Sequence, residues 1–277
     1  MLEERENYLT SLIAGGSAGL VVDITLFPID TIKTRLQSAQ GFFKAGGFRN
    51  VYRGIVPQAI GSAPSAALFF CTYDAFKRIL MPIVPVEHHA FVFMAGAAMG
   101  ETVACLIRVP VEVIKQRKQT SIGRMSSSKL LIEAYREGIF KGIYRGFFST
   151  VIREIPFSLI QFPLWEGFKY FWQTNLKNNN ELLSWEVAVC GALAGGISAF
   201  VTTPLDVAKT RIMLADKHLV SDHELRITNT LLRVYQEDSF KGLFSGWIPR
   251  TLWITLGGAI FFGTYDLTKQ FWTPYLV

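Results

Sequence analysis

The sequence predicts an all-α membrane protein made of three tandem repeats, each with two transmembrane helices. Half of the 277 residues are hydrophobic and only 18% are charged, against about 25% charged residues in an average soluble domain. A second observation is a hexapeptide, Pro-x-acid-x-x-base, that begins at Pro28, Pro110 and Pro204. Its acid and base lie three residues apart and share one helix face. Three copies in one chain indicate a triplicated architecture.

Each repeat contains two apolar segments long enough to be transmembrane helices. The six segments are 9–29, 54–73, 90–107, 146–164, 187–205 and 251–265. About 20 apolar residues in a helix cross the 30 Å hydrocarbon core of a bilayer. The alternative, a soluble α-solenoid, requires helices with a polar outer face at a period of 3.6 residues. These segments lack such a face, so a membrane protein is favoured.

The distribution of basic residues predicts the orientation. Lysine and arginine gather in the loops that follow the first, third and fifth segments, whereas the other loops are short and weakly charged. The positive-inside rule then places the three long loops on one side and both termini on the other. The net charge of +6 follows this topology and does not indicate a nucleic-acid surface. The acidic N-terminus resembles neither a signal nor a transit peptide, so we expect internal targeting information.

Two further motifs recur with the repeats. The second segment of each repeat ends in aromatic-acid-x-x-Lys, beginning at Tyr73, Trp165 and Tyr265, and starts after the loop motifs Tyr52-Arg53-Gly54, Tyr144-Arg145-Gly146 and Phe244-Ser245-Gly246. The first segments carry glycines four residues apart, Gly15/Gly19, Gly96/Gly100 and Gly191/Gly195, which let helices approach closely. Cys71, Cys105 and Cys190 are isolated, and we expect no disulfide, metal or cofactor.

On these motifs the chain resembles the mitochondrial carrier family (solute carrier family 25) over essentially its whole length. The resemblance implies six transmembrane helices with pseudo-threefold symmetry, three short matrix helices, and repeats at 1–80, 86–174 and 182–273. It also implies a monomer in the mitochondrial inner membrane, with its termini facing the intermembrane space, and alternating access to one central site. Cardiolipin is expected near the loop motifs. Ala45-Gly46 and Ser245 depart from the family pattern, which weakens the expected lipid sites of repeats one and three.

The resemblance further implies two ion-pair networks that act as gates. In the matrix gate the expected pairs are Asp30–Lys115, Glu112–Lys209 and Asp206–Lys33, with Gln37 and Gln119 as braces and Met213 in place of a third. In the cytoplasmic gate they are Asp74–Lys169, Glu166–Lys269 and Asp266–Lys77. Unpaired charges at that depth are costly, which is consistent with pairing.

Helical phase indicates which other side chains face the central axis. Asp23 and Glu101 precede Asp30 and Glu112 by seven and eleven residues, which places each within about 20° of the gate acid. An acid inside a membrane is functional by default, although Glu101 has the alternative of pairing with a neighbouring helix. The family's three substrate contact points correspond to Gly61, Arg153 and Trp253, and Glu154 follows the second. The alternative for Arg153 and Glu154 is that they bridge each other. Phe69 and Gln161 are further candidates, and packing is the alternative role of Trp253.

These groups predict the cargo. One arginine suits a carboxylate, the acids suit cationic centres, and an aromatic ring suits stacking or a cation–π contact. A nucleotide polyphosphate needs more bases, and a dicarboxylate is repelled by the acids. S-adenosylmethionine satisfies every group, and the resemblance implies exchange for S-adenosylhomocysteine. A carrier of lysine or arginine and an uncoupler-type proton leak stay open as alternatives. No catalytic constellation indicates an enzyme.

Overall fold

The computed structural model describes residues 2–85, 88–121, 125–175, 182–215 and 225–276. Side chains are described in these ranges except at 2–17, 90 and 184; from residue 261 on, only those of Thr264 and Thr268 are described. Within the described residues every regular element is a helix. The predicted all-α class is therefore confirmed.

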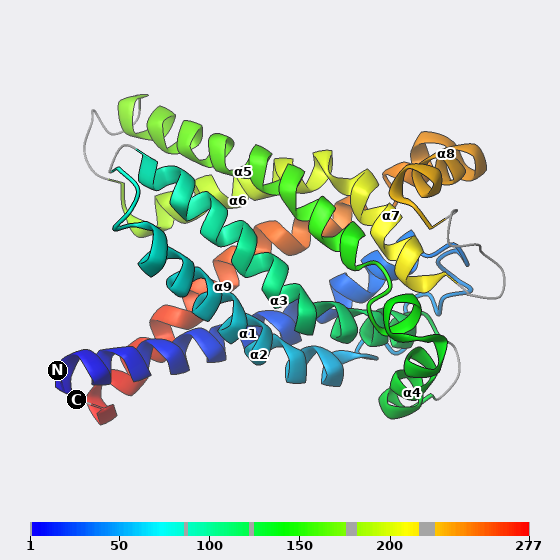
Figure 1. The fold of residues 1–277 in the computed structure, drawn as a ribbon, viewed down its shortest axis with the longest axis horizontal. Helices are drawn as coiled ribbons and strands as arrows, with labels where there is room; N and C mark the ends of the chain where they lie inside the picture. Colours follow the sequence, from blue (N-terminus) through cyan, green and yellow to red (C-terminus); the bar gives the residue numbers. More distant parts are fainter. Residues whose placement is uncertain (1, 86–87, 122–124, 176–181, 216–224, 277) are drawn as a thin grey trace.

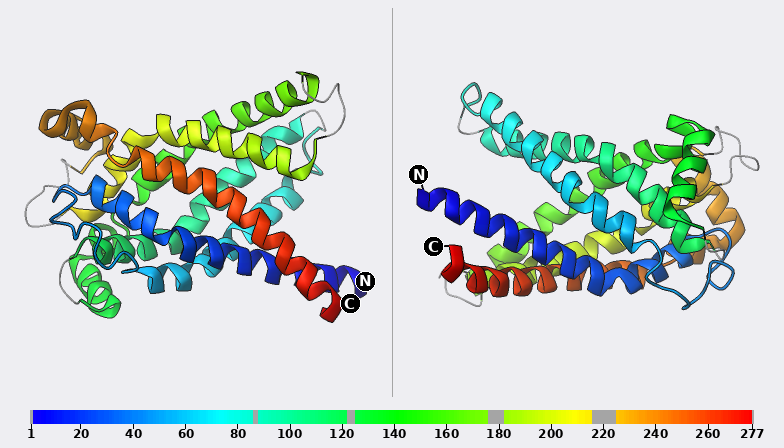
Figure 2. Two further views of the ribbon diagram at one scale, coloured as in Figure 1. Left: turned by 180° about the vertical axis from the view of Figure 1, so that it is seen from behind. Right: turned by 90° about the horizontal axis from the view of Figure 1, so that it is seen from below.

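Long helices form a ring of neighbours. They are α1 (Leu2–Gln37), α2 (Ile55–Leu80), α3 (His89–Thr120), α5 (Phe147–Asn175), the bent pair α6 (Ser184–Val201) and α7 (Thr203–Leu214), and α9 (Trp247–Leu276). α2 packs along α3, α5 along α6, α6 along α9, and α9 closes the ring against α1. Both chain termini lie at one end, which we call the terminal end; α4 and α8 lie at the other, the loop end (Figure 1). The helices converge toward the loop end (Figure 2).

By length and composition, two described helices are able to cross a membrane, Ile55–Leu80 and Phe91–Thr120. The bent pair Trp185–Val201 and Thr203–Leu214 makes a third candidate span. α1 and α5 carry charged residues in their apolar stretches, among them Asp23 and Arg153. Charged side chains in a span face the bundle interior rather than lipid.

The three signature prolines act differently on their helices. α1 and α3 continue through Pro28 and Pro110, whereas the chain bends by 63° between α6 and α7, just before Pro204. A proline removes a backbone donor and clashes with the preceding turn, so it frees carbonyl groups. Here Arg250 of α9 occupies the break, because its guanidinium donates to the Thr202 carbonyl at 2.9 Å and to its hydroxyl at 2.8 Å.

The loops of repeats two and three are helical, but that of repeat one is not. α4 (Ser127–Glu137), the short π-helix η2 (Ile139–Ile143) and α8 (Ile227–Leu243) follow α3 and α7, while residues 38–53 form consecutive turns. The expected third matrix helix is therefore absent from the described chain. Gly41, Gly46 and Gly47 have φ values of 81°, 111° and 53°, which an α-helix does not accommodate.

An arginine in the last turn of α1, α3 and α7 holds the loop that follows each of these helices. Arg117 pairs with Glu137 and Arg211 with Glu237 and Asp238, at 2.7 to 2.8 Å. Repeat one has Ala45-Gly46 in place of such an acid. There Arg35 donates to the Gly47 and Arg49 carbonyls at 2.6 and 2.7 Å, and its guanidinium lies where a side chain at residue 46 would be. The departure from the repeat pattern thus has a compensating contact.

The residue before each loop-motif glycine joins one repeat to the end of a helix in the next. Arg53 donates to the Ser121 carbonyl at 2.9 Å, Arg145 to the Ala215 carbonyl, and Ser245 to the Leu36 carbonyl at 2.5 Å. The last carbonyls of a helix have no partner within it, so these side chains cap the helices in a threefold pattern. Ser245 keeps this role although it is not basic.

Glycine allows α2 and α3 to pack closely. A Cβ at Gly96 would meet the rings of Tyr73 and Phe76 at 3.2 to 3.5 Å, and one at Gly61 would overlap the branched side chain of Val111 on α3. Gly19 differs, because a Cβ there would meet nothing within 4 Å. The paired glycines of α1 therefore do not both mark a close contact.

We predict that Gly61→Ala lowers the free energy of unfolding by about 1–3 kcal/mol, because overpacking against a stiff β-branched side chain forces the helices apart. Gly19→Ala is the matched control, and it should be neutral or stabilising by up to about 1 kcal/mol, since alanine favours the helix. Thermal unfolding of the purified protein in detergent measures both. Equal melting temperatures for the two variants would contradict the packing role of Gly61.

Candidate functional site

Three interhelical ion pairs cross the loop end of the ring. Lys115 Nζ lies 2.8 Å from Asp30 Oδ2, Lys209 Nζ lies 2.7 Å from the Glu112 carboxylate, and Lys33 Nζ lies 2.8 Å from Asp206 Oδ2. Each pair joins consecutive repeats, because the signature places acid and base on one face of each helix. In repeat three the bend between α6 and α7 precedes this face. The loop end is closed by these three pairs.

Two glutamines brace this network at the expected positions. Gln37 donates to Asp206 Oδ2 at 3.0 Å and Gln119 donates to Asp30 Oδ2 at 3.1 Å. The third position, Met213, lies in an apolar cluster with Cys105, Val109 and Val113. Glu112 receives a donor from its own helix instead, since Gln116 Nε2 lies 3.0 Å from Glu112 Oε1.

Of the opposite network, only the Asp74–Lys169 pair has both side chains among the described residues, and that pair is not formed. Lys169 pairs with Glu166 three residues earlier in α5, at 2.7 Å, and its Nζ lies 4.0 Å from the centre of the Trp165 ring. Lys77 lies 5.7 Å from the centre of the Phe93 ring. The side chains of Tyr265, Asp266 and Lys269 lie outside the described residues. Of the expected pairs, Asp74–Lys169 is replaced by the contact within α5, because the loop-end closure separates the helices at the terminal end.

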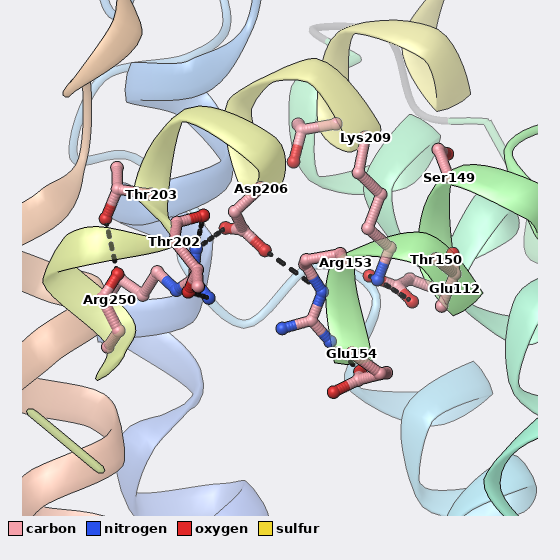
Figure 3. A network of polar contacts seen from close by, with 12 residues as sticks. Glu112, Ser149, Thr150, Arg153, Glu154, Thr202, Thr203, Asp206, Lys209 and Arg250 are labelled. Atoms are coloured by element: carbon pink, nitrogen blue, oxygen red, sulfur yellow. Dashed lines mark hydrogen bonds and ion pairs between the residues drawn. The ribbon is translucent and has the colours of Figure 1, made fainter. Parts of the chain in front are cut away.

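Arg153 connects the predicted cargo residues to the closed network (Figure 3). Its guanidinium pairs with Glu154, and its Nε lies 3.8 Å from Asp206 Oδ1. This Nε is buried and, among the described residues, has no hydrogen-bond acceptor. Asp206 is also 3.7 Å from Arg250. An arginine donor that is buried without an acceptor is costly and suits an incoming anionic group.

The two other predicted acids have partners that the sequence analysis did not name. Gln58 of α2 donates to Asp23 Oδ1 at 3.3 Å. Glu101 pairs with Arg108, seven residues later in the same helix. The alternative for Glu101, a partner on a neighbouring helix, is therefore wrong for this structure. The carboxylate of Asp23 has a neutral donor, and that of Glu101 has a cationic one.

The remaining candidates take different positions. Gly61 is buried against Val111 of α3, a packing role that differs from the expected substrate contact. Trp253 is partly buried on α9, one turn after Arg250. Phe69 is partly buried with its ring parallel to that of Tyr73 at 6.2 Å, and Gln161 lies close to Gly195. Among the described residues no group of three or more His, Cys, Asp or Glu is placed to hold a metal ion.

Three functional candidates were missed, namely Gln58, Arg108 and Arg250. The expectation of one interior arginine was wrong, since Arg108 and Arg250 join Arg153. A signal for Arg108 existed in its spacing, because residues seven apart share a helix face. Gln58 and Arg250 each lie four residues after the loop-motif glycines Gly54 and Gly246. That shared offset places them toward the preceding helix of their own repeat.

The family model for "Mitochondrial carrier protein" matches residues 4–83, 87–176 and 180–276. The chain belongs to this family, and it is thus a multi-pass transport protein of the mitochondrial inner membrane rather than an enzyme. A Drosophila melanogaster protein named "S-adenosylmethionine mitochondrial carrier protein homolog" is 57% identical over 98% of this chain and 96% of its own length. The "Mitochondrial S-adenosylmethionine carrier protein" of Danio rerio is 51% identical over 96% and 98%, and that of Mus musculus 51% over 95% and 94%.

We predict that Glu112→Gln destabilises the closed state by about 3–5 kcal/mol, because it leaves Lys209 buried without a counter-charge. Adding Lys209→Gln should restore most of this stability, since the double variant buries no unpaired charge. Thermal unfolding in detergent reports both. As a control, Glu237→Gln should cost less than about 1 kcal/mol, because that carboxylate is half exposed and Arg211 keeps Asp238. A double variant as unstable as Glu112→Gln would refute the pairing energetics.

Proposed function

We propose that the protein transports S-adenosylmethionine across the mitochondrial inner membrane in exchange for S-adenosylhomocysteine. The observation that carries the proposal is the Arg153–Glu154 pair beside Asp206, with a buried Arg153 donor that has no acceptor in the described part of the chain. An arginine next to a glutamate matches the carboxylate and ammonium groups of an amino acid. The names of the relatives from fly, fish and mouse support the same cargo.

In this proposal the cargo carboxylate binds Arg153 and its α-ammonium group binds Glu154. The sulfonium lies at Asp23, whose described partner is the neutral amide of Gln58. Trp253 or Phe69 supplies an aromatic surface for the base. Gly61 permits the close approach of α2 and α3 and makes no side-chain contact with the cargo.

Cargo binding is coupled to opening through Arg153. A carboxylate on Arg153 competes with Asp206, which then keeps Lys33, Gln37 and Arg250 but loses one neighbouring cation. The closed network as a whole loses the Arg153–Asp206 contact, and cargo binding offsets the cost of opening. A ligand shifts such an equilibrium only by its differential affinity for the two states. The pairs at the terminal end then form as those at the loop end separate.

The basic loops support an orientation with the loop end in the matrix and both termini in the intermembrane space. On this orientation the structure is the state closed toward the matrix. The three ion pairs of the loop end join repeats of one chain, which supports function as a monomer.

A cavity of about 740 Å³ at the loop end supports an anionic lipid, cardiolipin, as a further ligand. It lies between the loop motif of repeat two and the start of α8, and its lining includes Lys141, Tyr144, Gly146, Phe147 and Arg226. Its mostly apolar lining suits acyl chains, and basic residues beside a span suit a lipid phosphate. Arg145 also lines it, but its guanidinium bonds Lys141 and Ala215 carbonyls.

We predict that Asp23→Asn lowers uptake of S-adenosylmethionine at least about tenfold, because loss of the carboxylate removes the partner of the sulfonium. The assay is uptake of labelled S-adenosylmethionine into liposomes loaded with S-adenosylhomocysteine. Glu133→Gln, which neutralises an exposed carboxylate on α4, is the control and should transport normally. Full activity of Asp23→Asn would overturn this assignment. Strong competition by lysine or arginine would instead favour a basic-amino-acid carrier.

We also predict that a membrane potential drives import. S-adenosylmethionine carries one net positive charge and S-adenosylhomocysteine none, so each exchange moves one charge. A potential contributes about 2.3 kcal/mol per 100 mV for that charge. Uptake should rise when a potassium diffusion potential, negative on the side that receives the cation, is imposed on the liposomes, and fall when it is reversed. Uptake that does not depend on the imposed potential would contradict this exchange.

A further inference from the structure

The Glu101–Arg108 pair lies on the face of α3 that its neighbours leave free. Toward α2, Ala104 accepts a hydrogen bond from Ser65 and Gly100 meets Phe69. Toward α5 and α7, Cys105, Val109 and Val113 form the apolar cluster with Met213. Leu106 is exposed on the outer surface. The remaining face carries Glu101, Arg108 and Glu112, and Glu112 reaches Lys209 across the ring.

The height of the pair along the axis separates it from the amino-acid site. Arg108 precedes Glu112 by four residues and Glu101 precedes it by eleven. At a rise of 1.5 Å per residue, the two side chains meet about 10 Å from the gate acids, toward the terminal end. Arg153 lies at the level of the gate, beside Asp206. An amino acid linked to a nucleoside is a molecule of that length.

The chemistry of the pair complements one edge of adenine. Adenine presents an amino donor at N6 beside ring-nitrogen acceptors at N1 and N7. Glu101 offers an acceptor and Arg108 a donor, and both side chains are partly exposed, at 23% and 39%. The ring of Phe69 packs against Gly100, the residue before Glu101, so a flat apolar surface adjoins the polar pair.

We propose that Glu101 and Arg108 form the subsite that recognises the base of the cargo, with Glu101 accepting from N6 of adenine and Arg108 donating to a ring nitrogen. This inference rests on the proposed transport of S-adenosylmethionine and adds a determinant of specificity to it. Without cargo, the two side chains neutralise each other. With cargo, each exchanges part of that contact for the base, while Arg153 and Glu154 hold the amino-acid end.

The test compares uptake of S-adenosylmethionine with uptake of its deaminated, inosyl analogue, which has an oxygen acceptor at position 6 and a proton on N1. The wild-type protein should prefer the adenosyl compound by about tenfold, because the analogue places two acceptors together at Glu101. Glu101→Gln should bring the ratio toward one, since the glutamine amide is able to donate to O6. Arg108→Gln should also reduce it.

Matched controls are Glu133→Gln and Arg136→Gln, which make the same changes at exposed positions of α4 and should keep the wild-type ratio. Thermal stabilisation of each purified variant by the two compounds gives the same ratio without transport, so a variant that transports poorly is still informative. A wild-type protein that does not transport S-adenosylmethionine would overturn the proposed function. Uptake with an unchanged ratio in both Glu101→Gln and Arg108→Gln would overturn the base subsite alone and leave a pair that only balances charge.

Discussion

Compensation of charge between helices is the constraint on which the rest of the structure depends. An ion taken from water into a low-dielectric interior loses several kcal/mol of solvation, which only a well-placed counter-charge recovers. The signature supplies that counter-charge from the adjacent repeat, as in Glu112–Lys209. Because each partner belongs to another repeat, no repeat satisfies its own acid and base. The closed loop end, the bend in α6–α7 and the capping of helix ends across repeats all serve to bring these charges together.

Departures from threefold symmetry then differentiate the three equivalent pairs. Asp30 and Glu112 each have one lysine and one glutamine as donors, whereas Asp206 has Lys33 and Gln37 with Arg153 and Arg250 nearby. An acid with several cations remains charged and paired when one of them is withdrawn, so the closed network loses stabilisation in steps rather than all at once. Asp206 is therefore the gate acid through which cargo binding is able to affect the gate.

The family resemblance predicted the contacts that depend on position within the repeat. The pairs at the loop end and the braces Gln37 and Gln119 are of this kind, because the place of each residue in the repeated motif identifies its partner in the next repeat. It did not predict contacts set by tertiary geometry. Arg250 donates to the Thr202 carbonyl only because the helix breaks there. The Val111 side chain fills the space beside Gly61 only because α2 and α3 approach closely. The turns of residues 38–53 depend on backbone angles that an amphipathic pattern does not reveal. The seven-residue spacing between Glu101 and Arg108 was sufficient to predict that they share a helix face, but the pair was not predicted.

The partners of the three predicted cargo acids distinguish their roles. Glu154 is paired with Arg153 and Glu101 with Arg108, so each of these two pairs is neutral. Asp23 has the neutral amide of Gln58 as a donor, and the cation that acts on it, Lys115, is already paired with Asp30. A cargo with a balanced amino-acid end leaves the first two pairs balanced, and only a cargo with one additional cation also compensates Asp23. Lysine and S-adenosylmethionine both meet that electrostatic condition. They differ in the base, and the contact that separates them is therefore the Glu101–Arg108 pair rather than the acid that attracts the cation.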